Sequence, residues 1–160
     1  MKEIRLANSK GVALVDDADF ALLSQYRWYI KHDSRTNYAF GYVRGRRRDG
    51  KLVKMHRVIT DAPDGMDVDH VNGDGLDNRR NNLRICTRSQ NIGHSHKTAG
   101  CSSDFKGVSW DKGAGRWRAQ GKIAYKCIYL GYYDSEEDAA RAYNDFAREH
   151  FGEFALLNEV

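Results

Sequence analysis

The stretch "VDHVNGDGLDNRRNNLRICTRSQN", from Val68 to Asn91, gathers residue types suited to metal-assisted phosphodiester hydrolysis. The Asp69 carboxylate and the Asn91 side-chain oxygen are hard donors that suit Mg²⁺ or Mn²⁺ and are poor ligands for zinc. Magnesium keeps several waters and takes one or two protein oxygens together with phosphate oxygens. His70, with an ordinary pKa of about 6.5, can accept a proton from water at neutral pH.

A hairpin followed by a helix would bring these three side chains together. Thr87 and Gln90 stand three apart, which predicts a capping box and places Asn91 in the first turn of a short helix. Adjacent strand residues point to opposite faces, so Asp69 and His70 flank one phosphate only if the strand bends at the loop.

Two other interpretations of this stretch explain less. An EF-hand alignment puts His70 first and Asn81 twelfth, where calcium needs a carboxylate and a bidentate Glu. A Gly/Asn-rich turn exposed to water explains part of the loop, because Gly and Asn tolerate positive φ. It does not explain the Asp-His pair that enters the loop.

Basic residues are spread along the chain in runs, although the net charge is only +4 and 30% of residues are charged. This distribution suits a polyanion better than a membrane surface. Guanidinium groups match phosphate oxygens, so the arginines beside the loop are predicted to clamp phosphates. The runs comprise Arg44, Arg46, Arg47 and Arg48; Arg79, Arg80, Arg84 and Arg88; and Lys106, Lys112, Arg116, Arg118 and Lys122.

The three cysteines, Cys86, Cys101 and Cys127, are far apart and include no Cys-x-x-Cys pair. This spacing argues against a disulfide framework and a zinc knuckle. The N-terminus lacks an apolar targeting region, and no run of 18 apolar residues occurs. We therefore expect a soluble, cytoplasmic protein without a membrane partner.

The chain divides into two predicted parts joined by a Gly/Ser/His-rich linker at 93–104. Before it, VALV at 12–15 is a predicted strand and 16–26 an Asp-capped helix. Segments 27–31 and 38–44 form a predicted hairpin, and 51–59 a strand running into a helical turn. The predicted domains are therefore 1–92, with a core at about 55–92, and 105–160.

The second part contains three strand-like runs, KGVSW, RWRAQGKIA and CIYLGYY. Alternation places Arg116, Arg118, Gln120 and Lys122 on one face of the middle strand, and an apolar face opposite packs on a helix. Cys127 and Tyr129 share one face of the third strand. Ser135 begins the helix, with Asp138 in a capping box, and Gly152 ends it.

The Asp69-His70 pair with Asn82 and Asn91, in "DHVNGDGLDNRRNNLR", resembles the HNH nuclease family over about residues 55–92. The resemblance implies a ββα-metal fold with His70 as general base and Asp69 and Asn91 as metal ligands. Asn82 would tie the loop together and orient His70. The third motif position is often His in that family; here Asn91 favours a hard metal.

The C-terminal segment 105–158 is similar to the AP2 domain, through KGV, W, YLG, the EEDAARAY helix and the FGEFALLN tail. The resemblance implies a three-stranded sheet that lies in the DNA major groove. Arg118 is added to its DNA-facing set from the strand alternation. Ser109, Gln120 and Tyr129 depart from the more Arg- and Trp-rich plant pattern, so sequence preference is not transferred. The set comprises Lys106, Ser109, Arg116, Arg118, Gln120, Lys122 and Tyr129.

Together these observations predict an α+β chain, with an N-terminal ββα-metal HNH unit carrying extra strands and a C-terminal three-stranded antiparallel sheet packed on one helix. The expected activity is nicking or cutting of double-stranded DNA by a phage or mobile-element homing-type endonuclease, as a monomer or homodimer. The alternatives are a non-catalytic DNA-binding regulator that keeps the nuclease scaffold and a structural metal-binding module. A histidine recurs at the position of His56 in relatives of this kind, and packing at the strand-to-helix junction explains it at least as well as a direct role. At His94 and His96, a solvated linker is favoured over a second metal site.

Overall fold

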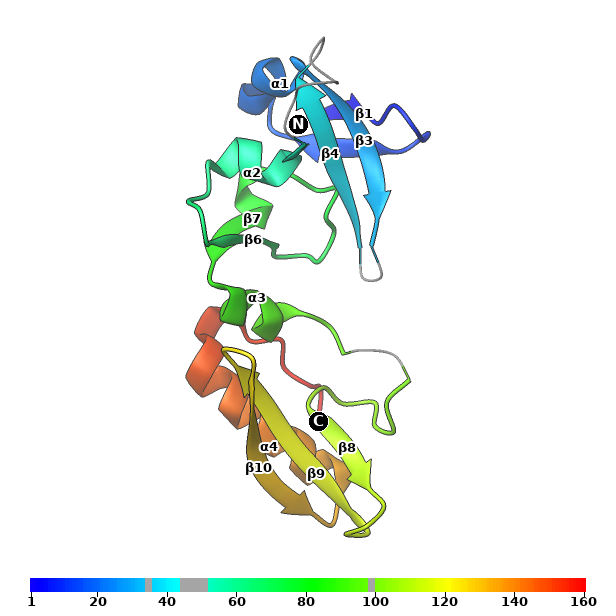
Figure 1. Cartoon of the computed structure of the whole chain (residues 1–160), viewed down its shortest axis with the longest axis vertical. Coiled ribbons are helices and arrows are strands. Elements are labelled where there is room, and N and C mark those ends of the chain that lie inside the picture. Colours follow the sequence, from blue (N-terminus) through cyan, green and yellow to red (C-terminus); the bar gives the residue numbers. More distant parts are fainter. Residues whose placement is uncertain (34–35, 44–51, 98–99) are drawn as a thin grey trace. The chain divides into compact units, whose positions relative to one another are not determined.

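The computed structural model describes residues 1–33, 36–43, 52–97 and 100–160. These residues form two compact units, Met1–Cys86 and Thr87–Val160. Both are built from small sheets and mostly short helices, which confirms the α+β class (Figure 1). Arg44, Arg46, Arg47 and Arg48 lie outside the described residues, so their expected DNA contact stays a prediction. In the described ranges no helix has the length and apolar character needed to cross a membrane.

The first unit begins with two small antiparallel sheets. Strands β1 (Lys2–Arg5) and β2 (Val12–Val15) form one, and β3 (Tyr26–His32), β4 (Asn37–Val43) and β5 (Val53–Lys54) form the other in the order β3-β4-β5. Helix α1 (Asp17–Leu23) connects them along the chain. The predicted strand at 12–15, the helix after it and the hairpin are therefore confirmed.

The core of the first unit lies between these sheets and the helices. Trp28 is buried at its centre, and its indole Nε1 donates to the carbonyl oxygen of Leu23 over 2.8 Å. Val15 and Met55 are fully buried in the same cluster. This arrangement gives the ring its large apolar contact area while the N–H keeps a partner.

Asp16 occupies the N-cap position of α1, but it makes no side-chain cap hydrogen bond there. Its Oδ2 instead accepts from the backbone amide of Arg80, 2.8 Å away. The prediction that the Asp16 side chain caps α1 is therefore wrong, because this carboxylate accepts from the Arg80 amide instead. The carboxylate acts at the start of the 3-10 helix η1 (Arg80–Asn82), where an orphan amide and the dipole favour it.

The part of the quoted stretch that belongs to the first unit, residues 68–86, folds as a hairpin beside the short helix α2 (Met55–Thr60). Strands β6 (Asp67–His70) and β7 (Leu83–Cys86) pair antiparallel, with Asp69 opposite Arg84 and His70 opposite Leu83. Helix α2 contacts both strands, as Figure 1 shows. The expected strand running into a helical turn at 51–59 is thus β5 followed by α2.

In the second unit, α3 (Arg88–His94) begins at Thr87, whose predicted capping box with Gln90 is present. Strands β8 (Val108–Asp111), β9 (Arg116–Ile123) and β10 (Lys126–Tyr133) form an antiparallel sheet in the order β10-β9-β8. Helix α4 (Glu136–Phe151) packs on this sheet and is followed by η2 (Gly152–Phe154). The Ser135 hydroxyl accepts from the Asp138 amide at 3.0 Å, so the predicted start of this helix is confirmed.

Helix α3 packs within the second unit, against α4. A Cβ at Gly93 would overlap the ring of Phe151, and one at Gly121 on β9 would overlap the ring of Phe146, so both glycines permit close helix packing. The sequence placed residues 87–92 in the first domain, whereas the compact units divide between Cys86 and Thr87. The boundaries 1–92, 93–104 and 105–160 stay a prediction.

Candidate functional site

His70, the last residue of β6, is buried against the rings of His56 and Tyr38. It is 5% exposed, and its ring centroid lies 5.2 Å from that of His56 and 5.9 Å from that of Tyr38. Its Nε2 is buried with no hydrogen-bond partner among the described residues. Burial lowers the pKa of His70, although the Asn78 side chain and the Asp69 carboxylate oppose this shift. The neutral imidazole, which a general base needs, is therefore favoured.

His56, on α2, packs edge-on against His70 and is 4% exposed. Burial, followed by the charge of His70, lowers the pKa of His56 from 6.5 to about 3. The structure thus places this histidine against the predicted base. Sequence patterns did not separate packing from a direct role for His56, and a part for His56 in any reaction stays a prediction.

Asp69 is 6% exposed, and its Oδ2 accepts from the Nε of Arg84 at 2.7 Å. The two residues face each other across the β6–β7 ladder. The ring neighbours of His70 are different residues, His56 and Tyr38. Asp69 and His70, adjacent in sequence, therefore have separate surroundings, as the alternation of a strand requires.

Asn82 closes the loop that follows His70. Its Nδ2 donates to the Asp77 carbonyl at 2.8 Å and to the Asn72 Oδ1 at 2.9 Å, and its Oδ1 accepts from the Asn72 amide at 3.0 Å. Its own carbonyl accepts from the Val71 amide, next to His70. A buried amide with this many partners fixes the loop.

The loop is also joined to β2 and lies against the first residue of β4. The Leu14 amide donates to the Leu76 carbonyl at 2.9 Å, and the Asn78 amide donates to the Leu14 carbonyl at 2.8 Å. At Gly75 an added Cβ would overlap the Asn37 carbonyl oxygen, so this position requires glycine. The loop is therefore held to the rest of the first unit by backbone hydrogen bonds and close packing, which a turn exposed only to water would lack.

The three arginines predicted to clamp phosphates each have a carboxylate partner. Arg79 makes two bonds to Asp77, at 2.7 and 2.6 Å, and Arg80 makes two to Asp19, at 2.8 and 2.7 Å. Arg84 bonds Asp69. These arginines support the loop and its flanks, and their contact with phosphate stays a prediction.

Asn91 lies on α3 in the second unit, whereas Asp69 and His70 lie in the first. Its approach to them stays a prediction. The described residues contain no cluster of three or more His, Cys, Asp or Glu side chains placed to hold a metal ion. A magnesium ion keeps several waters and needs only one or two protein oxygens, and Asp69 and Asn91 stay its predicted donors. His94 ends α3, and His96 is exposed in the next segment.

The outer face of the β8–β10 sheet carries the alternation that the sequence predicts. Ala119 and Gly121 of β9 are buried toward α4, while Arg116 and Lys122 are exposed on the opposite face. Register places Gln120 opposite Tyr129 and Lys122 opposite Cys127. Cross-strand partners share a face, so these residues line one open surface.

Two predicted members of the DNA-facing set have polar atoms turned to the protein: Lys106 binds backbone carbonyls, and Ser109, although on the sheet face, has a buried hydroxyl. Lys106 precedes β8, and its Nζ donates to the carbonyls of Ile92 and Gly93 at the end of α3. Ser109 lies opposite Arg118, and its buried Oγ has no hydrogen-bond partner among the described residues. Lys106 therefore also has a helix-capping position, where a cation is favoured.

Tyr132 lies on the same sheet face, and strand alternation in the sequence did not predict it there. A β-bulge between Tyr129 and Gly131 shifts the register, so Tyr132 stands opposite Arg118. Its ring meets that of Tyr129 at 5.5 Å, and its hydroxyl donates to the Asp111 carboxylate at 2.8 Å. Gly131 inside a strand was the available signal, because such a glycine often marks a bulge.

Comparison with known proteins finds two family models in the chain. Residues 53–92 match the HNH endonuclease model, and residues 103–153 match the AP2 domain model. No solved structure matches the chain.

Three relatives illustrate the two matches. An uncharacterized HNH endonuclease of Acanthamoeba polyphaga mimivirus is 28% identical over 162 residues, which cover 97% of this chain and 79% of the relative. A second uncharacterized HNH endonuclease of that virus is 32% identical over 41% of this chain and 18% of its own length. APETALA2-like protein 2 of Oryza sativa subsp. indica is 46% identical over 36% of this chain and 13% of its own length.

Proposed function

We propose that this chain, which combines a segment matching the HNH endonuclease family with a segment matching the AP2 domain, is a metal-dependent DNA endonuclease. The observation that supports it most is the buried His70 with an unpartnered Nε2, beside Asp69 and at the start of a loop closed by Asn82. The viral origin of two relatives supports a phage or mobile-element homing-type role.

In the proposed reaction, His70 accepts a proton from water, which attacks phosphorus in line. Its buried environment favours the neutral form that can take this proton. Asn82 positions His70 through the loop, and Arg84 holds the Asp69 carboxylate. Asp69 and Asn91 would hold Mg²⁺ or Mn²⁺, which supplies charge stabilisation at the phosphate and the leaving oxygen when bound.

The sheet of the second unit would hold the double-stranded DNA. Arg116 and Lys122 are exposed on its open face, and Arg118 and Gln120 lie between them on the same strand. Cationic and amide side chains bond phosphates and base edges. One catalytic unit per chain favours nicking by a monomer, or paired cutting by a homodimer.

Nicking of supercoiled plasmid in the presence of Mg²⁺ tests the proposal. We expect activity in the natural chain and its loss in Asp69→Ala and His70→Ala, with DNA binding retained. His96→Ala, on an exposed histidine, is the matched control and should nick normally. A regulator that only keeps the scaffold would show no nicking in any variant, and lost DNA binding in Asp69→Ala or His70→Ala would mean that these roles are misassigned.

A further inference from the structure

The outer face of the β3-β4-β5 sheet in the first unit carries alternating aromatic and basic side chains. Register places Arg27 opposite Tyr42 and Tyr29 opposite Phe40, and Phe40 is also opposite Lys54. Cross-strand partners share a face, and Lys31 lies two residues beyond Tyr29 on it. We call this surface the aromatic–cation face, and it consists of Arg27, Tyr29, Lys31, Phe40, Tyr42 and Lys54.

The cations of this face lie against rings and have no carboxylate partner among the described residues. The Nζ atoms of Lys31 and Lys54 lie 5.3 and 5.8 Å from the Phe40 centroid, and the Arg27 guanidinium carbon lies 5.7 Å from that of Tyr29. These cation–π contacts place the charges without neutralising them. Arg79, Arg80 and Arg84 differ, since each bonds a carboxylate. The cations of this face are therefore among the positive charges of the first unit that remain available to an anion.

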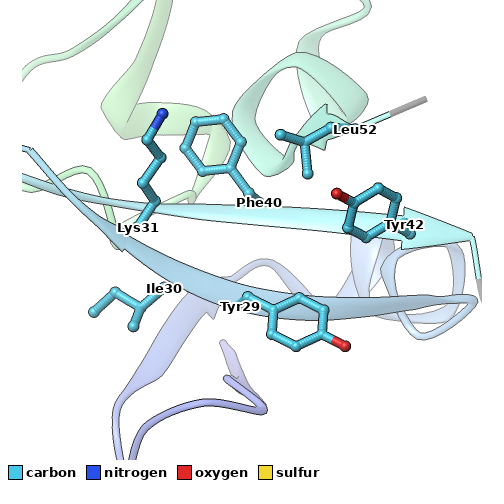
Figure 2. A pocket seen from close by; sticks show the side chains of 6 residues that line it. All are labelled: Tyr29, Ile30, Lys31, Phe40, Tyr42 and Leu52. Carbon is cyan, nitrogen blue, oxygen red and sulfur yellow. The ribbon is translucent and has the colours of Figure 1, made fainter. Parts of the chain in front are cut away.

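The rings also border a hollow of about 220 Å³. Figure 2 shows Phe40, Tyr42 and Leu52 around it, with Lys31 beside Phe40. Its volume is below the roughly 300–1,000 Å³ of common small-molecule sites, so it suits one planar ring rather than a larger compound. Tyr29, Phe40 and Tyr42 are each only half-buried, which leaves ring surface open to a ligand.

We propose that the aromatic–cation face binds unpaired DNA, with a base against the rings and neighbouring phosphates on Arg27, Lys31 and Lys54. Stacking needs the face of a base, which a duplex keeps within its own stack, whereas a single strand offers it. The three cations supply the charge that a polyanion requires. The face would thus hold a strand separated from the duplex, and its binding does not depend on cleavage.

Fluorescence anisotropy of the full-length chain with a labelled oligothymidylate of about 12 nucleotides tests stacking. EDTA is present throughout, so the result is independent of the proposed nuclease activity. Tyr29→Leu/Tyr42→Leu should lower affinity about tenfold, whereas Tyr29→Phe/Tyr42→Phe, which keeps the rings, should bind as the natural chain does. Both variants should bind a duplex unchanged. Equal single-strand affinity of the Leu and Phe variants, or an equal loss on duplex, would overturn the proposal.

The cations are tested separately with Lys31→Gln/Lys54→Gln, which leaves the rings in place should the Leu variant fail to fold. The slope of log affinity against log salt for the oligothymidylate should fall in magnitude by about 1.4, for two lost phosphate contacts. Lys10→Gln, at an exposed lysine outside the face, should leave the slope unchanged. A slope that stays the same in the double variant would show that the face does not bind phosphate and would also overturn the proposal.

Discussion

The Nε of Arg84 on β7 donates to the Oδ2 of Asp69 on β6 over 2.7 Å, across a hairpin within the segment that matches the HNH endonuclease model. The aspartate side chain is 6% exposed and the arginine 18%. A carboxylate this buried needs a cation or hydrogen-bond donors to stay ionised. Arg84 therefore has a structural role at Asp69, and its contact with phosphate stays a prediction.

Arg84→Gln should lower the free energy of unfolding of the first unit by about 3 kcal/mol, because it leaves the Asp69 charge buried with one partner fewer. Asp69→Asn/Arg84→Gln should lose less than the sum of the two single variants, since the charge itself is gone. Urea unfolding followed by the reactivity of the buried Cys86 thiol measures this, because Cys101 and Cys127 are exposed and react at once. Strictly additive losses would mean that the pair does not couple.

Asn82→Asp should abolish nicking and destabilise the first unit. A carboxylate cannot donate to the Asp77 carbonyl or to the Asn72 Oδ1, and it would add a buried charge. The expected loss of unfolding free energy is about 2–3 kcal/mol. Asn81→Asp makes the same chemical change at the exposed neighbour and should alter neither quantity. If Asn82→Asp nicks normally while its stability falls, then the loop does not position the base.

His56 should make the first unit sensitive to acid. Burial lowers its pKa in the folded state from 6.5 to about 3, so above pH 6.5 the imidazole is neutral whether the chain is folded or not. Below pH 6.5 the unfolded chain binds a proton at His56, whereas the folded chain does not bind it until the pH approaches 3. The free energy of unfolding therefore falls as the pH drops toward 3. At pH 5 the loss from this group is about 2 kcal/mol.

His56→Gln tests this, because glutamine does not titrate. The difference in unfolding free energy between pH 8 and pH 5, followed at the Cys86 thiol, should shrink by about 2 kcal/mol relative to the natural chain. A part of the acid loss should remain, since burial also lowers the pKa of His70. A pH dependence identical to that of the natural chain would show that His56 is solvated or paired in the folded protein.

Local patterns predicted most elements of this fold because each had its own signal. The capping box at Thr87 and Gln90, the alternation along β9 and the helix from Ser135 depend only on near neighbours, and all three are present. Asp16 shows the limit of such signals, since a distant amide, that of Arg80, competes for its carboxylate. The residue type predicted that the Asp16 carboxylate caps α1, but the tertiary structure brings the Arg80 amide to this carboxylate instead.

Residue types suggested the candidate site, but they did not predict which side chains its residues contact. Nothing local indicates that Arg80 meets Asp19 or that Arg84 meets Asp69, because these pairs are distant in sequence. The contact of His56 with His70 likewise requires α2 to pack on the hairpin. Tyr132 shares the sheet face of the predicted DNA-binding residues only because a β-bulge shifts the register of β10, which a strict alternation of two residues does not predict.

The open face of the β8–β10 sheet should supply phosphate contacts to duplex DNA. Arg116→Gln/Lys122→Gln should weaken duplex binding and reduce the salt slope by about 1.8, as expected for two contacts. Arg116 also pairs with the exposed Asp134, but such surface pairs contribute little to stability, so the fold should be retained. Arg141→Gln/Arg148→Gln removes the same number of charges from α4, which packs on the other side of the sheet, and should leave the slope unchanged. Equal slopes for the two variants would mean that DNA senses only the net charge of the chain, and the sheet would then have no specific contact with phosphate.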